Sequence, residues 1–244
     1  MDCAGRTAIV TGAAGNGIGR SIALTLAREG ASVVVNYRRS RASAEEIAER
    51  IRRRGGSAVA IQADVFTAER CRRLAEKTVE QFGPVDICVV GPGGGWHPET
   101  PDRLDSTAAL QVVHDELAPL YHLLPLVLPG MYERKWGRLI AIALLPPYQS
   151  RAYSYNVGKA ARTQALLRLR DEAWKHGVTV NVLGPGPVPA IASLEEAVEQ
   201  CDHGAAWQNR SSASPQDVAE GVAFLCSEAG RFISGCELPY LYAT

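Results

Sequence analysis

Short apolar runs alternate along the chain with stretches in which apolar residues recur every three or four positions. The apolar runs predict strands at residues 7–11, 32–36, 58–63, 86–90, 138–143, 179–183 and 237–241. The periodic stretches predict helices at 17–29, 41–54, 68–82, 105–133, 153–176 and 215–227. In the second helix, Ile47 and Ile51 lie four residues apart on the side away from the charges.

The order of these elements indicates the fold class. The second strand is apolar at every position from 33 to 35, which is typical of a parallel sheet covered by helices on both faces. Repeated strand–helix units imply right-handed crossovers, so we expect an α/β fold: a Rossmann-type doubly wound parallel sheet of about seven strands. No linker, repeat or low-complexity tract interrupts residues 1–244, and we interpret them as a single domain.

The charge balance narrows the class of partner. The chain has 26 Lys and Arg residues and 26 Asp and Glu residues. This balance argues against nucleic acid or an anionic membrane as the main partner, because both attract a basic surplus. The six cysteines are scattered without metal-ligand spacing, so we expect reduced thiols and no metal.

The chain shows no pattern typical of a signal peptide or a membrane span. Residues 1–6 run straight into an apolar strand. The most apolar stretch, 117–131, contains Pro119, Pro125 and Pro129 and is shorter than the roughly 20 residues that span a bilayer. We expect a cytoplasmic protein that acts on a small molecule, with 117–131 as a buried helix or a contact between subunits.

A glycine-rich turn joins the first predicted strand to the first helix. It reads TGAAGNGIG over residues 11–19, and its candidate cofactor-binding residues are Gly12, Asn16, Gly17, Ile18 and Gly19. Small residues let the backbone approach a pyrophosphate, and the helix N-terminus offers free N–H groups. Ile18 stands where a P-loop needs lysine, so the context favours a dinucleotide. A tight turn without a ligand is the alternative.

The end of the second strand indicates which dinucleotide. An acidic residue there bonds the ribose 2′-hydroxyl of NAD, whereas this chain has Asn36 followed by Tyr37, Arg38 and Arg39. Guanidinium groups bind phosphate with two parallel hydrogen bonds. These three residues therefore predict a 2′-phosphate site and NADP(H) as the cofactor. The alternative is a pair of solvated arginines that begin a helix.

Several short motifs follow one another in a single order. They are the turn 11–19, Asp64-Val65, the Tyr-x-x-x-Lys pair Tyr155 and Lys159, Asn181, Pro185-Gly186-Pro187-Val188, and Ile233-Ser234-Gly235. With this set, nearly the whole chain resembles the short-chain dehydrogenase/reductase family, and within it the NADP-dependent ketoreductases and 3-oxoacyl-carrier-protein reductases. The resemblance implies a homodimer or homotetramer. It also implies cofactor contacts from Asp64, Val65, Gly91, Tyr155, Lys159, Pro185, Gly186 and Val188.

Tyr155 and Lys159 are candidate catalytic residues on chemical grounds as well. Four residues apart on a predicted helix, they share a face. A free tyrosine has a pKa near 10, and we expect a nearby ammonium and an oxidised nicotinamide to lower it toward neutral pH. The resemblance implies that Tyr155 protonates a carbonyl oxygen as hydride arrives, while Lys159 bonds the nicotinamide ribose. A surface pair on a helix is the alternative.

Two positions depart from the family pattern and predict an atypical active site. Leu144 aligns with the family's serine and donates no hydrogen bond. Losing a donor to a developing oxyanion costs on the order of 10²–10³ in rate, unless Ser150, Tyr148 or Tyr153 substitutes. Glu116 stands in place of the family's asparagine. It is a candidate catalytic residue as a proton relay or a substrate-directed base, or it pairs with a neighbouring cation.

Residues beyond the carboxyl ends of the strands are candidate substrate contacts, because open α/β sheets bind ligands there. They are Trp96, His97, Leu144, Leu145 and Trp207. Residues 189–214 take the place of the family's substrate lid and contain an acidic helix predicted at 193–201. For Trp96, His97 and Trp207, a loop or packing role is the alternative.

Three classes of function remain open. The first is an NADPH-dependent ketoreductase that transfers hydride to a carbonyl or enone of a bulky, polyketide-like molecule, as in secondary metabolism. The second keeps the fold but has lost redox chemistry, giving a cyclase, isomerase or dehydratase. The third is a protein that senses nucleotide or stabilises a subunit. Tyr155 and Lys159 favour the first class, whereas Leu144 and Glu116 favour the second.

Overall fold

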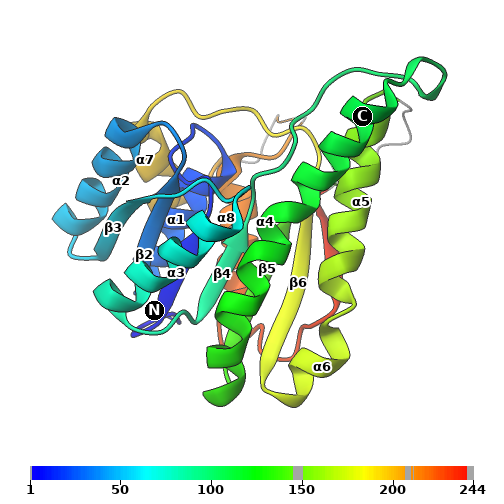
Figure 1. Ribbon diagram of the computed structural model, residues 1–244. Coiled ribbons are helices and arrows are strands. Elements are labelled where there is room, and N and C mark those ends of the chain that lie inside the picture. Colours follow the sequence, from blue (N-terminus) through cyan, green and yellow to red (C-terminus); the bar gives the residue numbers. More distant parts are fainter. Residues whose placement is uncertain (1, 145–150, 207–209, 211, 241–244) are drawn as a thin grey trace.

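The computed structural model describes residues 2–144, 151–206, 210 and 212–240. Within them, seven parallel strands form one sheet in the order β3-β2-β1-β4-β5-β6-β7 (Figure 1). The strands are β1 (Thr7–Val10), β2 (Ser32–Tyr37), β3 (Ser57–Gln62), β4 (Ile87–Val90), β5 (Gly137–Ile142), β6 (Val178–Pro185) and β7 (Cys236–Tyr240). This sheet confirms the predicted doubly wound α/β fold.

Helices cover both faces of the sheet (Figure 1). One layer consists of α1 (Ile18–Arg28), α2 (Arg41–Arg53), α7 (Leu194–His203) and α8 (Pro215–Cys226). The other consists of α3 (Ala68–Phe82), α4 (Ser106–Glu133), α5 (Tyr153–Leu167) and α6 (Arg170–Lys175), with the short 3-10 helix η1 (Pro101–Arg103) before α4. Because strand side chains alternate, Ala8 and Val10 of β1 enter the first core and Ile9 enters the second.

Successive strands are added to one side of β1 as far as β3 and then to its other side from β4 onward. Side chains join the strand ends at this switch between β1 and β4. The Thr11 hydroxyl donates to the Val89 carbonyl at 2.9 Å and accepts from the Gly91 N–H at 3.0 Å. The Asn36 side chain, near the end of β2, accepts from the Gly12 N–H at 3.3 Å. Open α/β sheets bind ligands at such a switch point, so this edge positions the candidate site.

The predicted helix 153–176 is divided in the structure, which corrects that prediction. A turn at residues 168–169 separates α5 from α6. There the Leu169 N–H bonds to the Leu166 carbonyl at 3.0 Å, three residues back instead of four. This tighter bond ends the α-helical ladder, and the following turn lets α6 begin as a new helix.

The acidic helix of the predicted lid forms as α7, from residue 194 to 203. Ser193 caps it, with Oγ accepting from the Glu196 N–H at 3.0 Å. Its buried face joins the core with α1, and Glu195 pairs with Arg50 of α2 at 2.7 Å. This helix therefore lies against α1 and α2, and the lid assignment for 189–214 stays a prediction.

The apolar stretch 117–131 lies inside α4, which continues through Pro119, Pro125 and Pro129 over 28 residues. Leu120, Leu123 and other apolar residues on its inner side are buried against the sheet. Among the described residues, no helix combines the length and apolarity needed to cross a bilayer.

Candidate active site

A residue distant in sequence fixes the N-terminus of α5. Glu99, in the loop between β4 and α4, accepts the Ser154 N–H through Oε1 at 2.6 Å, and its carbonyl accepts the Ala152 N–H at 3.1 Å. Ala152 has a left-handed backbone, with φ of 62°, which costs a non-glycine residue roughly 1–2 kcal/mol. The carboxylate also faces the positive end of the helix dipole. These contacts position the helix that carries Tyr155.

One face of α5 presents Tyr155, Lys159 and Arg162, because their spacing of four and three residues is that of neighbouring turns. Tyr155 is half-buried, Lys159 is 6% exposed and Arg162 is completely buried. The Lys159 Nζ atom lies 5.3 Å from the centroid of the Tyr155 ring. The structure thus brings the predicted catalytic pair together.

The Glu116 side chain reaches this face from α4 and is completely buried. Its Oε2 atom lies 3.2 Å from Lys159 Nζ and 3.0 Å from Arg162, and its Oε1 accepts the Gly94 N–H at 2.9 Å. Of the alternatives that the sequence leaves open for Glu116, pairing with neighbouring cations is the one that the geometry displays.

The electrostatics of the catalytic pair differ from expectation. Burial, together with the Glu116 charge, raises the pKa of Tyr155 to about 12, and Arg162 opposes this. Burial and the Arg162 charge lower the pKa of Lys159 to about 8, against the effect of Glu116. In the cofactor-free chain the pKa of Tyr155 is therefore raised, and the lowering expected from the ammonium together with an oxidised nicotinamide stays a prediction. The lysine charge is neutralised by a carboxylate that also repels a phenolate.

The glycine-rich turn has the room that a pyrophosphate needs. A Cβ atom added at Gly19 would lie 2.6 Å from the Gly12 carbonyl oxygen, so only glycine lets α1 start this close to the turn. At Gly15 and Gly17 an added Cβ would meet nothing within 4 Å. Gly17 also provides no side chain to cap α1, so the first N–H groups of this helix, those of Ile18 and Gly19, can bind an anion. These residues fit a dinucleotide.

Arg38 and Arg39 are exposed directly after β2. Within the described part of the chain, neither forms an ion pair with a carboxylate, and Arg38 lies over the Phe66 ring at 5.4 Å. Tyr37 differs from them, because it is only 7% exposed and belongs to the core beneath α1 and α2. Two guanidinium groups are thus free for a phosphate at this strand end.

The segment that follows β6 reaches the glycine-rich turn through Ile191. The Asn16 carbonyl accepts the Ile191 N–H at 2.8 Å, and Arg20 donates to the Ile191 carbonyl at 2.8 Å. These bonds bring the segment that follows β6 to the start of α1. In this region Pro185 is buried, whereas Gly186 and Val188 are half-buried.

On the β3 side, the Asp64 carboxylate accepts the Phe66 N–H at 3.1 Å, within the turn after the strand. Val65, the other member of this predicted pair, is buried.

The structure describes three of the five predicted substrate residues. Leu144 is half-buried and follows the end of β5, whereas Trp96, at 57% exposure, and His97 are exposed in the loop after β4. Leu145 and Trp207 lie outside the described residues, as do Tyr148 and Ser150, two of the proposed serine substitutes. Tyr153 is 41% exposed at the start of α5.

Sequence reasoning missed Arg162, Glu99 and two glycines that make room for Glu116. A Cβ atom at Gly93 would overlap the Glu116 carboxylate, and one at Gly158 would lie 2.7 Å from its Cγ atom. The spacing of Arg162 from Lys159 was a usable signal, because it places a third polar residue on the catalytic face of α5. Glu99 gave no signal, since the helix that it caps begins more than fifty residues later.

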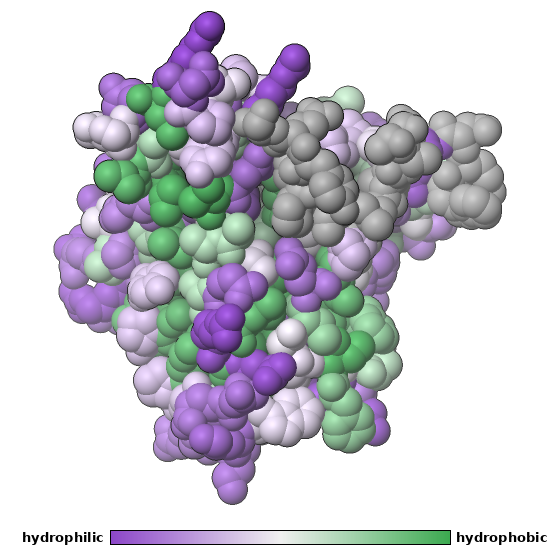
Figure 2. Space-filling view, turned by 90° about the vertical axis from the view of Figure 1, so that its right-hand side faces the viewer, coloured by the Kyte–Doolittle hydropathy of each residue, from purple (hydrophilic) through white to green (hydrophobic). Residues whose placement is uncertain are grey.

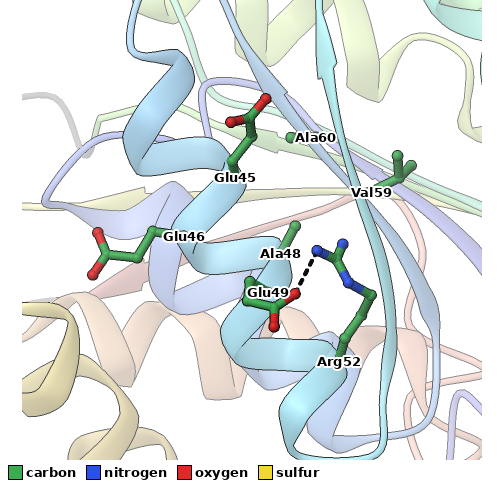
Figure 3. A pocket seen from close by; sticks show the side chains of 7 residues that line it. All are labelled: Glu45, Glu46, Ala48, Glu49, Arg52, Val59 and Ala60. Atoms are coloured by element: carbon green, nitrogen blue, oxygen red, sulfur yellow. Dashed lines mark hydrogen bonds and ion pairs between the residues drawn. The ribbon is translucent and has the colours of Figure 1, made fainter.

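A separate surface hollow of about 480 Å³ lies between α2 and β3 (Figure 3). Its polar side chains include Glu49 and Arg52, which pair with each other at 2.7 Å. β3 is an edge strand and three strands separate it from β5, beside which the catalytic face lies. We therefore assign this hollow no part in the candidate site.

The geometry defines a class: a nucleotide-binding α/β domain in which a buried lysine accompanies a tyrosine at the carboxyl edge of the sheet. The family model described as short chain dehydrogenase matches residues 6–200, and the chain belongs to this family. It is similar to acetoacetyl-CoA reductase of Allochromatium vinosum, with 30% identity over 96% of both chains. It is also similar to the 3-oxoacyl-[acyl-carrier-protein] reductase FabG of Staphylococcus epidermidis, with 31% identity over 94% of this chain and 95% of the relative.

Solved structures agree with this assignment. A hydroxysteroid dehydrogenase from Escherichia coli superposes with a TM-score of 0.83 and 29% identity, over 99% of this chain and 98% of the other. A 7α-hydroxysteroid dehydrogenase in complex with NADH and 7-oxo glycochenodeoxycholic acid gives a TM-score of 0.84 at 27% identity, over 98% and 93% of the two chains. The relatives support an oxidoreductase that uses a nicotinamide cofactor and acts on a small molecule.

Proposed function

We propose that the protein is an NADPH-dependent reductase of a carbonyl or enone group in a bulky small molecule. The observation that carries this proposal is the Tyr155–Lys159 pair on one face of α5. With a pKa of about 12, the Tyr155 hydroxyl keeps its proton at neutral pH. A protonated phenol is the form that can donate to a carbonyl oxygen in a reduction.

A bound nicotinamide dinucleotide supplies the hydride. The first turn of α1 holds its pyrophosphate, and Arg38 and Arg39 hold a 2′-phosphate. Tyr155 orients the substrate oxygen and donates the proton to it. Lys159 holds the ribose and stabilises the phenolate that remains on Tyr155. Leu144, which aligns with the family's serine, leaves this oxygen with one donor fewer.

The test combines purified protein with NADPH and two panels of substrates: 3-oxoacyl thioesters, suggested by the reductases to which the chain is similar, and bulky cyclic ketones or enones. We expect NADPH oxidation in step with alcohol or saturated product. Tyr121→Phe is the control for Tyr155→Phe, because this tyrosine lies on α4 and is exposed. Absence of NADPH oxidation with every carbonyl tested would contradict the proposal.

A second candidate is a non-redox cyclase, isomerase or dehydratase on the same fold. The observation that favours it is the pairing of Lys159 with Glu116 at 3.2 Å, because an ammonium held by a carboxylate is less free to bind a ribose. Incubating the same substrates with and without NADPH separates the two functions. Product formed at equal rate without cofactor would establish the second function in place of the first.

We further propose that the protein is a homodimer or homotetramer. Figure 2 looks from the right-hand side of Figure 1, where α5 lies, and shows hydrophobic residues exposed on this face among hydrophilic ones. Exposed apolar side chains include Leu110 and Tyr121 on α4 and Val157 on α5. Light scattering on the purified chain tests this proposal, and a monomer mass would contradict it.

A further inference from the structure

We propose that Arg162 is a positioning residue of the active site: it holds the Glu116 carboxylate, and through it the Lys159 ammonium, against the ends of β4 and β5. The proposal rests on the proposed function only in the role that it gives to Lys159.

The Arg162 guanidinium contacts three parts of the fold around Lys159. It is completely buried. It donates to the backbone carbonyls of Gly91 at 2.9 Å, Ile142 at 3.1 Å and Glu116 at 2.7 Å, and also to that of Pro92. The same group lies 3.0 Å from the Glu116 carboxylate. One side chain of α5 thus joins α4, the loop after β4 and the end of β5.

The space around Glu116 is shaped for a carboxylate. Gly93 and Gly158 bound it on two sides, where a Cβ atom would collide with this side chain. The Gly94 N–H provides a third contact at 2.9 Å. Glutamate, arginine and two glycines therefore form one unit that comes from three parts of the chain.

Charge explains why the unit controls Lys159. A buried carboxylate needs cationic or hydrogen-bonding partners, and Glu116 has two cations within 3.2 Å. Without Arg162, Lys159 alone neutralises Glu116, so the ammonium is held more firmly in the interior. Without Glu116, two cations are buried side by side and Lys159 loses its proton more readily. The two deletions have opposite effects on one measurable group.

The experiment follows the titration of Lys159 in the cofactor-free protein by NMR. Lysine labelled with ¹³C at Cε gives few signals, since the chain contains only Lys77, Lys135, Lys159 and Lys175, and Lys159→Arg assigns the relevant one. The pKa of Lys159 is about 8 in the unmodified chain. We expect Glu116→Gln to lower it by roughly one unit or more, Arg162→Met to raise it, and the double variant to fall between the two.

Two further variants complete the comparison. Arg162→Lys keeps the charge and should restore the titration toward that of the unmodified chain. Arg168→Met removes an exposed arginine at the end of the same helix and should leave the titration unchanged. If Arg162→Met does not fold, Glu116→Gln is compared instead with the double variant Glu116→Gln/Arg162→Met. The double variant removes the Glu116 and Arg162 charges together, so neither is left without the other.

A purely structural Arg162 would lower stability without moving the Lys159 pKa. An unchanged Lys159 titration in Glu116→Gln, or in Arg162→Met, would overturn the proposal. Because the readout needs neither NADPH nor substrate, it remains valid if no reductase activity is found. Where activity is found, the pH profile of kcat/KM should move in the same directions as the NMR titration.

Discussion

The predicted nucleotide-binding region and the predicted catalytic region are built in different ways. Around the glycine-rich turn, small residues leave open space, and the available groups are backbone N–H groups and two exposed arginines that form no ion pair with a described carboxylate. Around α5, space is filled and the buried charged groups are already paired, as in the Glu116–Lys159 contact. The polar groups of the first region are left for a ligand to bind, whereas the charged groups of the second region bind one another. Substitutions should therefore affect ligand affinity in the first region and pKa values and packing in the second.

The largest effect is expected from Tyr155→Phe. Removing the proton donor should lower kcat by about 10²–10⁴-fold, the range typical of a positioned acid, with little change in NADPH affinity. Steady-state kinetics and a fluorescence titration with NADPH measure the two quantities. Retention of full turnover would remove Tyr155 from the mechanism.

Replacing Arg38 and Arg39 together with serine should weaken NADPH binding by about 10–100-fold, because a hydrogen bond to a charged group contributes about 1.5–3 kcal/mol. Affinity for NADH should hardly change. Arg53→Ser is the control, since this exposed arginine on α2 pairs with Glu49 at 2.9 Å. Equal losses for the two cofactors, or no loss for either, would show that these arginines do not read a 2′-phosphate.

Adding one methyl group at two glycines compares the two regions directly. Gly158→Ala places a Cβ atom 2.7 Å from Glu116, whereas Gly15→Ala meets nothing within 4 Å. Overpacking typically costs about 1–3 kcal/mol, so Gly158→Ala should lower the free energy of unfolding by that amount and Gly15→Ala should not. Urea denaturation measures both. Equal stabilities would mean that the space around Glu116 is not filled.

The smallest effect is expected from pH. Lys159 has a pKa of about 8 and Tyr155 one of about 12. Below pH 8 both groups carry their protons, so kcat/KM for reduction should be flat. Above pH 8 Lys159 loses its charge and no longer stabilises the developing phenolate, so the rate should fall by up to about tenfold per pH unit. A profile that rises between pH 8 and 9 would contradict this order of titration.

The two regions also differ in how well the sequence predicts them. The glycine-rich turn, Arg38 and Arg39 act through local backbone geometry and position at a strand end, so the pattern of a few consecutive residues locates them. The sheet and most helix boundaries follow from hydrophobic periodicity for the same reason. The break between α5 and α6 was not predicted, because one tightened hydrogen bond at Leu169 ends the helix without glycine or proline.

The arrangement around α5 cannot be predicted from a few consecutive residues. Glu116 was a candidate with three interpretations, and the choice among them depends on Arg162, forty-six residues further on. The raised pKa of Tyr155 follows from that arrangement and from burial, neither of which the Tyr-x-x-x-Lys spacing contains. Glu99 likewise acts through a tertiary contact with the start of α5.

The glycine at position 158 has a consequence for the order in which this site can change. Any side chain at position 158 collides with Glu116. Glu116 must therefore be replaced by a smaller residue before Gly158 can be replaced by a larger one. Shrinking Glu116 first leaves Arg162 and Lys159 as neighbouring buried cations, a costly intermediate. A lineage that had acquired this arrangement would therefore find each single step back unfavourable, and restoring the family's asparagine would require at least Arg162 to change first.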